Sequence, residues 1–112
     1  MMRRYVSTDI PEIREFFKED PHLLIRLEAG LQALDLLYFD IWVARDEQDA
    51  VQGVLFRSYG DFYLRLTPQA DLQEVSAFLG FMPMLYSLSG EESVMQELLP
   101  MLQRVRSTTI CT

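Results

Sequence analysis

Two residue types that often carry catalysis occur once each in this chain, as His22 and Cys111. A histidine titrates near neutral pH and could serve as a general base, but His22 directly follows Pro21 at the start of an expected helix, where a solvated side chain is the more common outcome. A reactive thiol needs a local positive field, which the sequence around Cys111 does not establish. One histidine and one distant cysteine do not make a metal site. We therefore identify no catalytic, cofactor-binding or metal-binding residue here.

Aromatic and arginine side chains on or beside the expected strands form the most suggestive group. Tryptophan, tyrosine and arginine are enriched in binding hot spots and in ligand grooves. If helices cover only one face of the sheet, part of this group lines the other face as a ligand groove or a protein contact. Core filling and cross-strand pairing are the alternative, and the more common outcome for such residues. The candidate ligand or interface residues are Trp42, Phe56, Arg57, Tyr59, Tyr63, Arg65 and Tyr86.

Four stretches of apolar residues at steps of three and four predict four helices. Capping carboxylates and proline mark some of the starts, since Pro21 follows Asp20, and Glu74 stands three residues after Asp71. Pro100 must bend or end the last helix. The apolar stretches run from Ile10 to Phe17, Leu24 to Leu37, Leu72 to Leu79 and Met95 to Leu102.

Alternation of apolar and polar residues predicts a run of three strands in the middle of the chain. Gly60 and Asp61 form a hairpin signal between two of them, and strands joined by tight turns make an antiparallel meander. The β-branched tail 107–112 could form an edge strand or fray. The expected strands cover residues 4–6, 39–44, 50–59, 62–67 and 84–88.

These elements follow one another without a linker, which predicts one mixed α/β (α+β) domain over residues 1–112. Its order is β-α-α-β-β-β-α-β-α, with helices packed on a mainly antiparallel sheet. The chain carries 17 acidic and 10 basic residues, a net charge of −7, and the basic residues are scattered. Nucleic-acid binding and attraction to an anionic membrane are therefore not expected. Without an apolar leader or a pair of cysteines, a cytoplasmic location is expected.

This order resembles the N-terminal and central part of the GNAT-type N-acetyltransferases, the acyl-CoA N-acyltransferase fold. Residues 4–13 look like the first strand of that family running into its first helix. Residues 42–47 and 50–55 look like its second and third strands, with the family's frequent glycine at Gly53. Residues 62–68, the following helix and residues 84–88 look like its fourth strand, pyrophosphate helix and fifth strand. The kinship predicts that these fourth and fifth strands are parallel and splayed apart.

The phosphate-binding loop of that family is missing. Its Arg/Gln-x-x-Gly-x-Gly/Ala pattern lets backbone amides at a helix start approach the pyrophosphate of acetyl-CoA closely. The corresponding residues 67–75 contain no glycine, and they place Asp71 and Glu74 where the negative charge of the ligand would lie. The chain also ends before the later strands of the family. The resemblance thus implies a truncated or degenerate member, or a chain completed by its partner.

The resulting expectation is a GNAT-like domain without acetyl-CoA-dependent activity of its own. It would act as a small-ligand or protein-interaction domain and bind no cofactor. We expect a homodimer, because an open sheet edge invites pairing and the tail from Ser107 onward is the candidate edge or swapped strand. One alternative is an active N-acetyltransferase that uses acetyl-CoA through a divergent loop, assembled across a dimer. The second alternative is an unrelated α+β partner-binding module.

Overall fold

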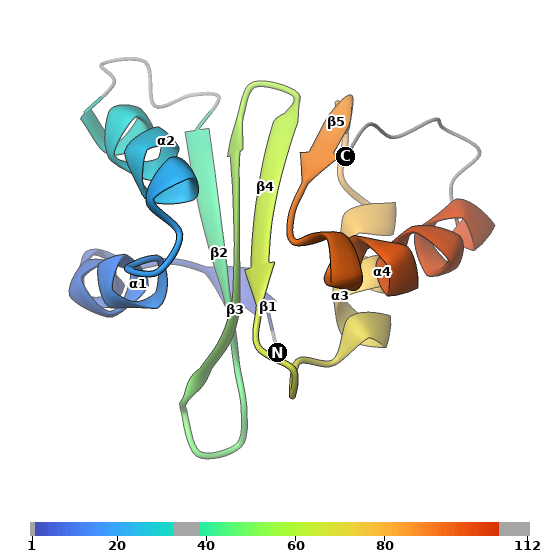
Figure 1. The fold of residues 1–112 in the computed structure, drawn as a ribbon, viewed down its shortest axis with the longest axis horizontal. Coiled ribbons are helices and arrows are strands. Elements are labelled where there is room, and N and C mark those ends of the chain that lie inside the picture. Colours follow the sequence, from blue (N-terminus) through green and yellow to red (C-terminus); the bar gives the residue numbers. More distant parts are fainter. Residues whose placement is uncertain (1, 33–38, 106–112) are drawn as a thin grey trace.

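The computed structural model describes residues 2–32 and 39–105 (Figure 1). The expected tail strand at 107–112 lies outside the described residues. So does the end of the second predicted helix, which was expected to reach Leu37.

Five strands form one sheet in the order β1-β2-β3-β4-β5. Neighbouring strands from β1 to β4 are antiparallel, whereas β4 and β5 are parallel. The sheet is therefore mixed and mainly antiparallel, and the predicted meander is confirmed. The strands are β1 (Met2–Arg4), β2 (Phe39–Arg45), β3 (Val51–Ser58), β4 (Asp61–Leu66) and β5 (Ser87–Ser89).

Helices cover both faces of the sheet, with α1 and α2 on one face and α3 and α4 on the other (Figure 1). The strands are apolar on both faces: Ile41 and Phe56 pack toward α1 and α2, and Leu55 and Leu64 pack toward α3 and α4. The premise that helices cover only one face is therefore wrong. The helices are α1 (Ile10–Phe16, after a 3-10 turn at Ser7–Asp9), α2 (Pro21–Gln32), α3 (Leu72–Gly80) and α4 (Glu92–Val105).

Three strands lie within one residue of their predicted bounds, and the first and last strands differ by more because of local hydrogen bonds. The first strand ends at Arg4, since the amide of Val6 turns to donate to the Asp9 carboxylate at 2.8 Å. The last strand begins at Ser87 instead of residue 84, because the amides of Tyr86 and Ser87 both donate to the carbonyl oxygen of Gly60. Pro100 does not end α4, which continues to Val105.

The parallel pair β4 and β5 separates soon after it forms. Asp61, Phe62 and Tyr63 pair with β5, and this pairing ends opposite Ser89. β4 then continues to Leu66, still paired with β3 on its other side. A gap in the sheet therefore opens between the end of β4 and the start of α4.

Candidate functional site

Three cavities meet at the point where β4 and β5 separate, and we call them together the central groove. The largest, of about 590 Å³, lies between α1 and the end of β4. The second, of about 410 Å³, lies between the starts of α3 and α4, and it shares Leu66, Thr67, Pro68 and Glu91 with the first. The third, of about 320 Å³, shares Arg65 and Glu91 with the first and is also lined by Asp20 and Ser89. The groove thus passes from one face of the sheet to the other.

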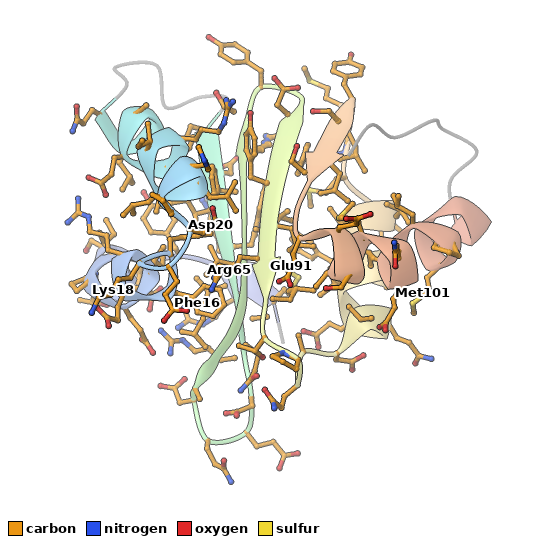
Figure 2. All side chains as sticks on the ribbon, in the orientation of Figure 1. Phe16, Lys18, Asp20, Arg65, Glu91 and Met101 are labelled. Atoms are coloured by element: carbon orange, nitrogen blue, oxygen red, sulfur yellow. The ribbon has the colours of Figure 1, made fainter. Side chains whose placement is uncertain are left out.

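Arg65 joins β4 to the helices on the α1 face of the groove. Its Nε donates to the carbonyl oxygen of Phe16 at 3.0 Å, and its Nη1 lies 3.7 Å from the Asp20 carboxylate. Its guanidinium also lies over the Phe16 ring, 5.8 Å from the centroid. Figure 2 shows Arg65 and Glu91 at the centre of the molecule, with Phe16 and Lys18 on the α1 side. The positive charge of Arg65 is therefore largely compensated by the Asp20 carboxylate, the Phe16 carbonyl oxygen and the Phe16 ring.

A partly buried ion network holds α1 in place at the edge of the groove. Arg45 donates to Glu12 at 2.7 Å and to Asp9 at 3.0 Å. The hydrogen bond to Glu12 is the largest cause that raises the pKa of Arg45, so the guanidinium stays charged. The amide of Val6 is the largest cause that lowers the pKa of Asp9, followed by the opposing effect of burial and then the contact with Arg45. Of the carboxylates lining the groove, Glu12 is thus neutralised.

Several other carboxylates along the groove have no ion-pair partner within the described residues. Glu19 lines the largest cavity, Glu97 lines the second, and Glu91 lines all three. No described cation lies within ion-pair distance of these three groups. The two cations that line the groove are Lys18, which lies 3.8 Å from Glu15, and Arg65. The groove is therefore net negative and repels polyanions.

The start of α3 is closed by its own capping residue. The Asp71 carboxylate accepts the amide of Gln73 at 3.0 Å and the amide of Glu74 at 3.2 Å. These are first-turn amides that a bound phosphate would otherwise use at a helix start. The predicted cap is confirmed, and the anion position at this helix is filled by the protein.

Trp42 and Arg57, two of the predicted site residues, lie together on the α3 face of the sheet. The Trp42 ring stacks on Phe62 and meets the edge of Phe78, with centroids 6.3 and 5.5 Å apart. The Arg57 guanidinium lies 5.9 Å from the Trp42 centroid and 2.8 Å from the buried carboxylate of Asp40. This pair is partly buried core structure.

Phe56 and Tyr63 lie on the opposite, α1 and α2 face. Phe56 is fully buried, and its ring stacks on Tyr63 with centroids 5.0 Å apart. Arg26 of α2 covers the outer side of Tyr63 at 5.2 Å and donates to its hydroxyl at 3.2 Å. Cross-strand pairing thus accounts for these contacts.

Tyr59 and Tyr86 are exposed at one end of the sheet, beside the β3–β4 turn. Their exposed fractions are 55% and 67%. The Tyr86 ring lies against Gly60, where any added Cβ would collide with it. Of the seven predicted site residues, Arg65 alone lines the central groove, and the other six divide among three separate places.

Sequence reasoning missed Glu91, Leu66 and Thr67 as groove residues. None of them belongs to a recognisable motif. The groove forms where β4 and β5 separate, and the residues on either side of that point come from distant parts of the chain. The expectation of splayed fourth and fifth strands was the one available signal. His22 also lines the third cavity, with an exposed side chain at the start of α2.

Within the described ranges, no group of three or more His, Cys, Asp and Glu side chains is placed to hold a metal ion. None of the described helices combines the length and the apolar character that a membrane crossing requires. The chain matches no protein-family model, no curated protein and no solved structure.

Proposed function

We propose that this chain is a GNAT-like domain that has lost its acyl-CoA site and binds a small ligand or a protein partner in the central groove. The GNAT-like assignment is supported by the element order and by the parallel pairing and separation of β4 and β5. An open space at that separation gives a ligand access to both faces of the sheet.

The capped start of α3 is the observation that carries the loss of the acyl-CoA site. Acyl-CoA brings several phosphate charges, and a helix start can bind one of them only through free amides. The Asp71 carboxylate already takes up two of these amides. The carboxylates of Glu91 and Glu97, which have no cationic partner among the described residues, line the cavity that adjoins this helix start. A pyrophosphate is therefore disfavoured here for two reasons: the first-turn amides of α3 are already used, and the surrounding carboxylates are negatively charged.

The separation of β4 and β5 also favours one alternative, an active N-acetyltransferase with a divergent acyl-CoA loop. In that case acetyl-CoA would enter the gap beyond Tyr63 and Ser89 without using the start of α3. Such an enzyme could be completed across a homodimer.

Titration with acetyl-CoA separates the two functions. A ligand at about one hundred times its dissociation constant adds about 2.7 kcal/mol to the free energy of unfolding. We expect the melting temperature of this protein to stay unchanged at millimolar acetyl-CoA, and no free thiol to be released from acetyl-CoA in the presence of amines. An active acetyltransferase serves as the positive control in both assays. Stabilisation by acetyl-CoA would overturn the proposal and favour the enzyme.

The expected homodimer remains part of the proposal. Within the described residues, β1 and β5 each pair with one neighbour only, so each has an outer edge of three residues. Light scattering coupled to size-exclusion chromatography should give twice the monomer mass of 13.1 kDa. A monomer mass at high protein concentration would remove dimerisation from the proposal.

A further inference from the structure

The edge of β4 that faces β5 is free at its C-terminal end. The amide of Thr67 donates to the carbonyl oxygen of Gln52 at 2.8 Å, and hydrogen-bonded residues alternate along an antiparallel pair. The amide and carbonyl of Leu66 therefore point away from β3, toward the side on which β5 pairs. That pairing ends at Tyr63 and Ser89. Among the described residues, no strand takes up the backbone groups of Leu66.

These free backbone groups face open space. Leu66 lines both of the larger cavities, of about 590 and 410 Å³. Gly90 narrows the other end of the gap, since a Cβ there would lie 3.0 Å from the Leu64 carbonyl oxygen. β4 ends at Leu66, and the carbonyl oxygen of Thr67 already accepts the amide of Ala70, so an added strand would meet free backbone groups at Leu66 alone. The groove thus offers one backbone donor and one backbone acceptor to a short added strand.

Carboxylates and apolar side chains line both sides of the groove. On the α1 face, Glu15, Glu19 and Glu91 line the largest cavity. On the α3 and α4 face, the second cavity is lined by the apolar side chains of Leu72 and Val94 and by the carboxylates of Glu91 and Glu97. Side chains of an added strand point alternately to the two faces. A segment that alternates basic and apolar residues would therefore find carboxylates for its bases and apolar neighbours for its other side chains on either side.

We infer that the occupant of the central groove is an extended basic peptide segment that adds as a short strand to the free edge of β4. This inference rests on the proposed function, because the peptide occupies the space that an acyl-CoA molecule would otherwise need. The backbone of Leu66 supplies the hydrogen bonds, and the carboxylates of Glu19 and Glu91, which form no ion pair within the described residues, select positive charge.

Three capped pentapeptides test the inference on the full chain by calorimetry and by amide NMR titration. The first alternates lysine and valine, the second alternates glutamate and valine, and the third is the lysine peptide with N-methylated valines. We expect the lysine peptide to bind about tenfold more tightly than the glutamate peptide at low salt, and less tightly at about 0.5 M NaCl. N-methylation should weaken binding about tenfold, because it removes strand hydrogen bonds. The amide signals of Leu66 and Glu91 should shift during the titration.

Matched variants locate the site. Glu91→Gln should weaken binding of the lysine peptide about threefold, whereas Glu47→Gln, in the β2–β3 turn outside the groove, should leave it unchanged. Equal affinity for the methylated peptide would overturn strand addition, and binding that ignores Glu91→Gln would overturn the location. No binding of the lysine peptide would overturn this inference while leaving the proposed function standing. Stabilisation by acetyl-CoA would overturn the proposed function itself.

Discussion

The cap at the start of α3 has two roles, because one carboxylate both holds the helix and occupies the anion position. Asp71 has an extended backbone with φ −82° and ψ 101°, and it accepts two first-turn amides at 3.0 and 3.2 Å. We predict that Asp71→Ala removes both hydrogen bonds and lowers the stability of the whole domain. Global stability is affected because α3 contributes the buried residues Val75 and Leu79 to the core.

The expected loss follows from the geometry of the cap. Asp71 is exposed, so water can take up the released amides, and no buried charge is left behind. Replacement of an aspartate cap by alanine then costs about 1 kcal/mol, within a range of about 0.5–2 kcal/mol. In a domain of this size, 1 kcal/mol corresponds to a decrease of about 4–8 °C in the melting temperature.

Urea unfolding followed by tryptophan fluorescence measures this loss. Trp42 is the only tryptophan, and its ring meets Phe78 of α3 with centroids 5.5 Å apart. Asp71→Asn keeps an oxygen acceptor and should stay within a few tenths of a kcal/mol of the wild type. The neighbouring change Gln69→Ala is the matched control. An Asp71→Ala protein as stable as the wild type would refute the assignment of this carboxylate as a cap.

Inorganic phosphate gives a second readout of the same substitution. If the Asp71 carboxylate occupies the anion position, phosphate should raise the melting temperature of Asp71→Ala more than that of the wild type, since helix starts attract anions. Equal shifts would contradict the conclusion that this carboxylate fills the site.

Three further predictions concern the elements that position the groove. Gly60→Ala should destabilise the protein by about 1–3 kcal/mol, because its Cβ would lie 2.8 Å from the carbonyl oxygen of Met84; urea unfolding checks this, and an unchanged midpoint would contradict it. Leu27→Ala, at the fully buried position of α2, should lower the free energy of unfolding by about 2–5 kcal/mol in the same measurement. The hydrogen bond from Val6 lowers the pKa of Asp9 below 3.8, so its stabilising contribution is present above that value and is lost as the pH falls through the lowered pKa. The Asp9→Asn protein should therefore unfold at lower urea concentrations at pH 7, and its free energy of unfolding should depend less on pH below about 4. The same pH dependence for the variant and the wild type in that range would contradict this.

The local signals in the sequence were sufficient to predict the order of the elements. The cap at Asp71 and the start of α2 at Pro21 are made by residues close together in the chain, so composition and spacing reveal them. The turn before β4 was placed almost correctly: it consists of Tyr59 and Gly60, one residue earlier than expected, with φ 58° at Tyr59. A one-residue offset of this kind depends on strand register, which neighbouring residues do not determine.

Most residues of the candidate site could not be predicted from the sequence. The aromatic residues looked like a shared surface, but Trp42 and Phe56 point to opposite faces of a sheet that helices cover on both sides. The groove depends on where β5 stops pairing with β4, and it collects Glu19, Arg65 and Glu91 from three distant parts of the chain.

The sequence by itself thus determined the helices, the strands and the closed start of α3, because caps and apolar periodicity act within a few residues. The tertiary structure alone decided which face each side chain covers and where the sheet opens. Those outcomes depend on contacts between segments far apart in the chain, whose energies no local pattern contains.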